Sequence, residues 1–155
     1  MSATATRLRS VGPVGGLGLL AILGVGFVHF YLRFFGDPQY AYAPKINVLF
    51  ILNAVFAVVF VVAFLWRPHW TLAAVGVGFA LSTMASYLYS RYNSTGLFKF
   101  KELRIDNWGW ASLTCEVVAA LCLGFWAFSS LLRAQRGRNA ASEPLAAQPA
   151  QTPVP

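Results

Sequence analysis

Four long apolar stretches dominate this chain, and short polar segments separate them. The stretches cover residues 14–35, 46–66, 70–90 and 108–132. Each reaches or exceeds the roughly 20 residues that a helix needs to cross the hydrocarbon core of a bilayer. The pattern predicts an all-α fold, namely an integral membrane bundle of four transmembrane helices.

The polar residues inside the four stretches gather in one half of the membrane. Depth can be counted from the side that holds the connecting segments 36–45 and 91–107. The near half then contains His29, Asn47, Asn53, Ser82, Thr83, Ser86, Thr114 and Glu116. The far half consists almost entirely of Leu, Val, Ala, Phe and Gly. This distribution predicts a polar pocket that opens on one face only.

Five of these residues form the candidate site. At a rise of 1.5 Å per residue, four of them lie about 9–12 Å from the ends of their spans, and Ser86 lies in the same half. Small residues share their helical stripes, as Gly26 and Gly18 do with His29, and as Ala120, Gly124 and Ala127 do with Glu116. We expect one polar pocket or helix-packing cluster made of His29, Asn53, Thr83, Ser86 and Glu116.

Glu116 is the chemically most demanding member of this cluster. A buried carboxylate near lipid must find a partner or take up a proton. We expect it to pair with His29, with Asn53 and Thr83 completing the hydrogen bonds. Such a cluster can fix the register of the helices, hold a ligand or ion, or support proton-coupled transport. The apolar far half argues against a continuous pore.

Composition places the chain in the membrane and excludes other classes. It is 57% hydrophobic and 11% charged, whereas soluble proteins average about 25% charged residues. The net charge of +7 comes from Lys and Arg at span ends and in the tails, where they meet lipid headgroups. We therefore expect lipid as a partner, together with other membrane proteins or further copies of the chain, and no nucleic acid.

No motif for catalysis or cofactor binding appears. Cys115 and Cys122 are seven residues apart on one predicted helix, about 10 Å along its axis, which is too far for a disulfide between them. No metal-ligand spacing, nucleophile elbow, phosphate loop or pair of catalytic carboxylates is present. We predict a protein without enzyme activity, cofactor or metal.

The ends of the chain and the central hairpin define its organisation. Residues 1–13 read as a basic N-terminal leader, and residues 133–155 as a disordered tail rich in Arg, Ala and Pro. Trp66 and Trp70 bracket a tight turn, which marks a membrane hairpin with its tip at the headgroups. Lys and Arg number six on each side of the membrane. The arginines of the two tails favour cytoplasmic termini in the plasma membrane.

A scattered set of residues between 44 and 116 resembles a known group of proteins. It comprises Pro44, Ile46, Leu49-Phe50, Leu52-Asn53-Ala54, Tyr87, Ser90, Gly96-Leu97-Phe98, Phe100, Glu102 and Glu116. This set is similar to that of uncharacterised small four-span membrane proteins of high-GC actinobacteria, over about residues 29–125. The resemblance implies the fold and an envelope location, and no activity. Small multidrug exporters also have four spans and one membrane carboxylate, but theirs lies in the first span and Glu116 in the fourth.

Two functions fit these observations. The first is a non-catalytic accessory or interaction component of the cell envelope. The alternative is a small transporter or ligand-binding membrane protein whose one-sided pocket is centred on Glu116. The two differ in structure: a ligand pocket predicts a hollow lined by Glu116 and His29, whereas an accessory bundle predicts direct contact between these side chains.

Overall fold

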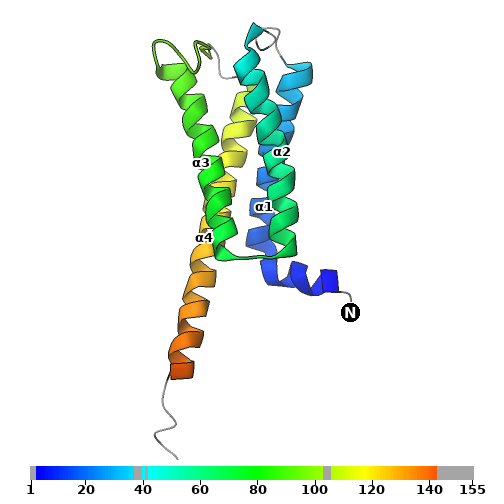
Figure 1. Cartoon of the computed structure of the whole chain (residues 1–155), viewed down its shortest axis with the longest axis vertical. Coiled ribbons are helices and arrows are strands. Elements are labelled where there is room, and N and C mark those ends of the chain that lie inside the picture. The colour runs from blue at the N-terminus through cyan, green and yellow to red at the C-terminus, as the bar shows by residue number, and fades with distance from the viewer. Residues whose placement is uncertain (1–2, 37–39, 41, 103–105, 143–155) are drawn as a thin grey trace, which may run out of the picture.

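Four helices make up the computed structural model, which describes residues 3–36, 40, 42–102 and 106–142 (Figure 1). They are α1 (Ala3–Phe35), α2 (Pro44–Trp66), α3 (Trp70–Tyr92) and α4 (Asn107–Ser142). Each contains a segment that is long and apolar enough to cross a membrane. The predicted all-α membrane bundle is confirmed, and the protein is a multi-pass membrane protein.

Part of the predicted N-terminal leader, residues 1–13, is helical. Helix α1 begins at Ala3 and breaks at Gly12, whose φ of 67° and ψ of 174° lie outside the helical region. Glycine adopts a positive φ without a steric cost, and Pro13 suits the first turn of the helix that follows. The segment before Gly12 therefore turns away from the bundle (Figure 1), and the membrane span begins at Val11.

The hairpin between α2 and α3 matches the sequence pattern. Helix α2 ends at Trp66, α3 begins at Trp70, and three residues join them. The His69 side chain caps α3 by accepting a hydrogen bond of 3.3 Å from the Thr71 amide. We call this end of the bundle the hairpin end, and the end with the segments 36–45 and 91–107 the loop end.

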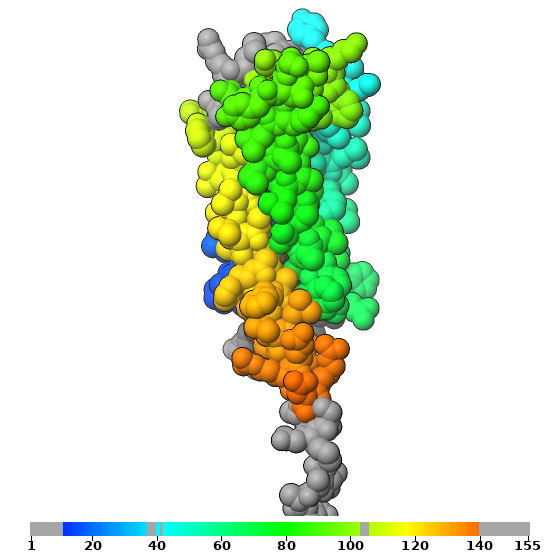
Figure 2. Space-filling model, turned by 90° about the vertical axis from the view of Figure 1, so that its left-hand side faces the viewer, coloured from blue at the N-terminus to red at the C-terminus, as the bar shows by residue number. Residues whose placement is uncertain are grey.

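Helix α4 continues ten residues beyond its predicted end at 132, as far as Ser142. The prediction of disorder from residue 133 is therefore wrong for residues 133–142. Ala, Arg and Gln in this segment are good helix formers, and no proline interrupts them. The side chains of residues 132–139 are exposed, and the extension projects past the other helices (Figure 2). The remainder of the predicted tail, 143–155, lies outside the described residues.

Helices α1 and α4 form the centre of the bundle. Helix α1 packs along both α2 and α4, and α3 packs along α4, whereas α2 and α3 touch only sparingly. Small residues allow the close approaches: a Cβ atom on Gly26 would lie 2.6 Å from the Cβ of Ala57 in α2, and one on Gly18 would lie 2.9 Å from Leu123 in α4. Helices α2 and α3 consequently diverge from the hairpin toward the loop end (Figure 1).

The hairpin half of the bundle is closed by large side chains. Phe64, Ile22 and Leu123 are fully buried there, and Phe64 meets Trp126 edge-on with ring centroids 4.9 Å apart. At mid-depth Phe56 of α2 stacks on Phe79 of α3 at 4.3 Å. A second, separate cluster of buried side chains packs in the loop half and consists of Val28, Leu32, Tyr40 and Ile46.

Candidate functional site

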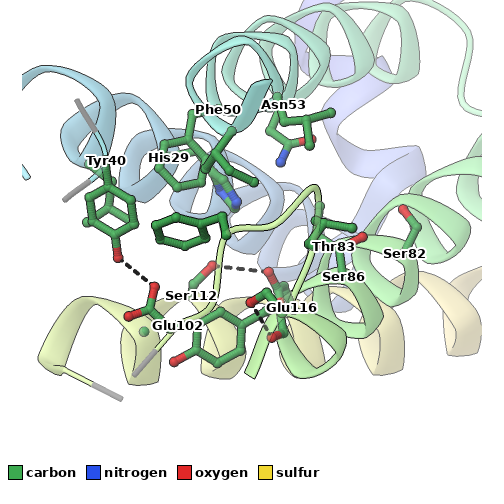
Figure 3. A pocket seen from close by; sticks show the side chains of 18 of the residues that line it. His29, Tyr40, Phe50, Asn53, Ser82, Thr83, Ser86, Glu102, Ser112 and Glu116 are labelled. Atoms are coloured by element: carbon green, nitrogen blue, oxygen red, sulfur yellow. Dashed lines mark hydrogen bonds between the residues drawn. The ribbon is translucent and has the colours of Figure 1, made fainter. Parts of the chain in front are cut away.

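A cavity of about 230 Å³ occupies the loop half of the bundle, where all four helices and both connecting segments contribute to its wall (Figure 3). Its polar lining consists of His29, Tyr40, Asn53, Ser82, Thr83, Ser86, Tyr87, Ser90, Glu102, Asp106, Ser112 and Glu116. Its apolar lining consists of Leu32, Ile46, Leu49, Phe50, Leu97, Phe100 and the backbone of Gly109.

The structure brings all five candidate residues to this cavity: His29 from α1, Asn53 from α2, Thr83 and Ser86 from α3, and Glu116 from α4. Two other polar residues of the same half do not line it. Thr114 is exposed on the outside of α4 and donates to the Trp110 carbonyl at 2.8 Å. The Asn47 amide nitrogen donates to the Tyr40 carbonyl at 2.9 Å, close to the end of its span.

Glu116 is 2% exposed and has one of its two oxygens unpartnered. The Ser112 hydroxyl, one helical turn earlier, donates a hydrogen bond of 3.0 Å to Glu116 Oε1. Glu116 Oε2 is buried without a hydrogen-bond partner. Most buried polar atoms in proteins are hydrogen-bonded. This carboxyl oxygen in the wall of the cavity is therefore an exception.

The predicted pair between His29 and Glu116 does not form. His29 Nδ1 lies 2.8 Å from the Val25 carbonyl oxygen of its own helix, and its ring meets Phe50 edge-on at 5.2 Å. A carbonyl oxygen can only accept, so Nδ1 carries a proton, and Nε2 of the neutral ring is left as an acceptor. The Val25 carbonyl therefore takes the place of a carboxylate as the partner of His29 Nδ1.

The stripe of small residues predicted beside Glu116 is only partly buried. The buried side chains of α4 below Glu116 are Ala119, Leu123, Trp126 and Ala127, and of these Ala127 alone belongs to the predicted stripe. Around Gly124 the nearest neighbour of an added Cβ is Val77, at 3.9 Å, so Gly124 does not permit a close approach. Because α4 packs between α1 and α3, the large side chains of Leu123 and Trp126 fill space that the small residues were expected to occupy.

Three hydroxyl groups of the cavity direct their protons to backbone carbonyl oxygens, whereas the Tyr87 hydroxyl is buried without a hydrogen-bond partner. Thr83 Oγ1 lies 2.9 Å from the Ala80 carbonyl oxygen and 3.1 Å from that of Phe79. Ser82 and Ser90 likewise donate to carbonyl oxygens of α3, each at 2.8 Å. A hydroxyl has one proton, so these groups can offer a ligand only lone pairs.

The connecting segments close the cavity at the loop end. Tyr40 donates to Glu102 Oε2 at 2.9 Å, and the Glu102 amide donates to the Ser90 carbonyl at 3.3 Å. Asp106 caps α4 by accepting from the Gly109 amide at 2.7 Å. Sequence reasoning missed Tyr40, Glu102 and Asp106 as site residues. An acidic residue directly before a helix start is a cap signal that could have located Asp106.

A tight hairpin forms part of the same cover. Leu97 and Phe100 exchange two backbone hydrogen bonds of 2.8 Å, and the two residues between them, Phe98 and Lys99, have φ angles of 51° and 69°. Positive φ at both central residues is the geometry of a type I′ turn, which normally selects Asn-Gly. The strained turn points Leu97 and Phe100 toward the cavity, which they line.

The side wall between α2 and α3 is incomplete. Above the Phe56–Phe79 stack, Asn53 of α2 is half-buried, while Ser82 and Ser86 of α3 are exposed, and all three line the cavity. Helices α2 and α3 make few contacts with each other. The wall of the cavity therefore includes exposed side chains on the flank of the bundle, at the depth of the lipid chains.

Among the described residues, no group of three or more His, Cys, Asp and Glu side chains is placed to hold a metal ion. Cys115 and Cys122 are both free thiols. No protein-family model matches the chain, and no curated protein or solved structure matches it. The similarity to the actinobacterial four-span group remains a prediction.

Proposed function

We propose that this protein is a non-catalytic membrane protein that binds a small molecule in the cavity centred on Glu116. One observation carries the proposal: the unpartnered Glu116 Oε2 is buried in the wall of a hollow and not in a packed interface. The Ser112 hydroxyl of the same helix occupies Glu116 Oε1, and Oε2 is left to face the hollow. A small transporter is the related alternative.

We further propose the plasma membrane as the location, with both termini in the cytoplasm. The extension of α4 carries Arg133, Arg136 and Arg138 next to the membrane, and Arg7 and Arg9 lie on the same side. Arginines that flank spans favour the cytoplasmic face and its anionic lipids. Reporter fusions at residues 12 and 140 should both give cytoplasmic signals, and opposite signals would contradict the four-span topology.

Native mass spectrometry of the protein purified from its own membrane tests the binding function. A bound small molecule should accompany the wild type and should be lost from Ser86→Trp, which places a large ring in the cavity. Val75→Trp is the matched control, because Val75 is an exposed residue on the same helix. This control should retain the molecule and the thermal stability of the wild type.

The accessory function predicted from the sequence gives a different result. In that case no molecule accompanies the wild type, and Ser86→Trp leaves the set of co-purified membrane proteins unchanged. Loss of a protein partner from Ser86→Trp, without any bound molecule, would identify the gap between α2 and α3 as a protein interface.

A further inference from the structure

The cavity is acidic although the protein is basic. The chain has five Asp and Glu residues against twelve Lys and Arg, with a net charge of +7. Three of the five acidic residues, Glu102, Asp106 and Glu116, line the cavity. Among the residues that the structure describes, no Lys or Arg lines it. The electrostatic character of the cavity is therefore opposite to that of the whole molecule, and it favours a cation over an anion.

The inner end of the cavity presents two acceptor atoms, one on Glu116 and one on His29. Glu116 Oε2 is buried and unpartnered, and His29 Nε2 is an acceptor because Nδ1 donates to Val25. The hydroxyl protons of Thr83 and Ser112 are already used within their own helices. A molecule that satisfies this end must bring its own N–H or O–H donors. An ammonium group brings up to three donors and also neutralises the carboxylate.

The rest of the cavity is apolar and small. Leu32, Ile46, Leu49, Phe50 and Phe100 form its walls. Its volume of about 230 Å³ exceeds the roughly 150 Å³ of an apolar protein cavity that takes up benzene. It lies below the roughly 300–1,000 Å³ of pockets for drug-sized ligands. A single ring or short chain with one polar head fits these dimensions.

We propose that the ligand is a small amine with an apolar body, bound with its ammonium group between Glu116 Oε2 and His29 Nε2. This inference rests on the proposed function, since it names the chemical class that the same cavity takes. The ligand reaches the cavity from the lipid, through the gap between α2 and α3.

The route through the gap follows from how the two entrances are covered. At the loop end, the Tyr40–Glu102 hydrogen bond and the Leu97–Phe100 hairpin lie across the mouth. On the flank, Ser82 and Ser86 are exposed beside Asn53, and among the described residues no aromatic pair such as Phe56–Phe79 joins α2 and α3 at this level. An amine with an apolar body partitions into the bilayer interface and meets this gap directly.

Three probes that share one phenyl-alkyl body test the chemical class. They are 2-phenylethylamine, 2-phenylethanol and 3-phenylpropionate, measured by calorimetry on the full-length protein in lipid nanodiscs. The amine should bind the wild type more tightly than the alcohol by roughly 10- to 100-fold, the difference expected when a hydrogen bond becomes charge-assisted. The anion should not bind measurably. In Glu116→Gln the preference for amine over alcohol should disappear, while Thr114→Val, on the outer face of α4, should keep it.

Failure of this inference can be told from failure of the proposed function. If the alcohol or the anion binds wild type as tightly as the amine, the cavity binds ligands but not amines as a class. If the preference for the amine survives in Glu116→Gln, the cavity takes amines but Glu116 is not the group that holds the ammonium, and the proposed binding mode is wrong. If no probe binds and no molecule co-purifies with the wild type, both proposals are wrong. The comparison of the three probes on wild type needs no variant, so it stands even where Glu116→Gln fails to fold.

Thiol labelling tests the route of entry. In a Cys115→Ala and Cys122→Ala background, Ser86→Cys should react faster with a lipid-soluble alkyl maleimide than with a charged, membrane-impermeant reagent. Phe98→Cys is the control, because Phe98 is exposed on the hairpin at the loop end, and it should react readily with the charged reagent. Labelling of Ser86→Cys by the charged reagent at the rate of Phe98→Cys would show entry from the aqueous side.

Discussion

Tyr40 donates a hydrogen bond of 2.9 Å to Glu102, and this contact joins two connecting segments across 62 residues of sequence. Both side chains are buried, and Tyr40 also packs against Phe50 and Phe100 with ring centroids about 5.5 Å away. The pair ties the cover of the cavity to the top of α2. Its strength should therefore affect both the stability of the fold and access to the site.

Removal of the Tyr40 hydroxyl should destabilise the protein. Tyr40→Phe keeps the ring but takes a donor from the buried Glu102 carboxylate, a loss of about 1.5–3 kcal/mol for a hydrogen bond to a charged group. Tyr42→Phe is the matched control, because Tyr42 lies in the same segment and is 88% exposed. Denaturant unfolding in detergent should place Tyr42→Phe within about 0.5 kcal/mol of the wild type. Equal stability of the two variants would mean that the Tyr40 hydrogen bond contributes nothing.

The same contact predicts a pH dependence above neutrality. Burial, and then the charge and hydrogen bond of Glu102, raise the pKa of the Tyr40 phenol above its ordinary value of 10.0. Above about pH 10 the phenol ionises in the unfolded chain but keeps its proton in the folded protein. The unfolded state then binds fewer protons, so this stabilisation is complete below pH 10 and is lost as the pH rises further.

Unfolding measured between pH 9 and pH 11 checks this sign. The free energy of unfolding of wild type should fall more steeply above pH 10 than that of Tyr40→Phe, by up to about 1.4 kcal/mol per pH unit. The other tyrosines are present in both proteins, so their titration cancels in the difference. Parallel profiles would show that the Tyr40 pKa is the same in the folded and unfolded chains.

The contact between α1 and α2 should be intolerant of a single methyl group at Gly26. Gly26→Ala would put a Cβ 2.6 Å from that of Ala57, which forces the helices apart at a cost of about 1–3 kcal/mol. Gly16→Ala is the control on the same helix, because nothing lies within 4 Å of an added Cβ there, and alanine is the better helix former. Thermal unfolding should therefore shift down for the first variant and not for the second. A downward shift of similar size in both would point to helix propensity and not to packing.

Two double-mutant cycles compare the observed partner of Glu116, Ser112, with the predicted partner, His29. Ser112→Ala with Glu116→Gln should show a coupling free energy of about 0.5–3 kcal/mol, the range for groups in contact. His29→Leu with Glu116→Gln should be additive within about 0.5 kcal/mol, because no hydrogen bond or ion pair joins them. A larger coupling in the second cycle would restore the pair between His29 and Glu116.

Hydropathy was sufficient to predict where the helices lie. The ends at Phe35 and Trp66 and the start at Trp70 agree with the apolar runs, because an uncharged run of about 20 residues has one stable solution in lipid. Hydropathy does not detect a helix that lies outside the membrane. The segment after Leu132 was expected to be disordered, yet it is helical as far as Ser142, because helix propensity and not hydropathy decides there.

The residues of the candidate site could be predicted from the sequence, but their hydrogen-bond partners could not. Depth counting selects His29, Asn53, Thr83, Ser86 and Glu116, all of which line the cavity. It cannot say that the Val25 carbonyl accepts from His29 Nδ1 or that Ser112 donates to Glu116 Oε1. Those partners lie one helical turn away, and many polar residues could have competed for them. Tyr40 and Glu102 escaped notice because a contact between two loops leaves no periodicity in either sequence.

The packed hairpin half of the bundle limits the path of any molecule that occupies the cavity. Phe64, Trp126 and Leu123 leave no passage toward the hairpin end, so while this half stays packed the cavity is a dead end. A molecule that enters must leave by the side from which it came. Its residence then follows the concentration in one leaflet alone and performs no net movement across the membrane. Under the proposed function, the protein in this conformation responds to one leaflet only, and conduction would require Phe64 and Trp126 to separate.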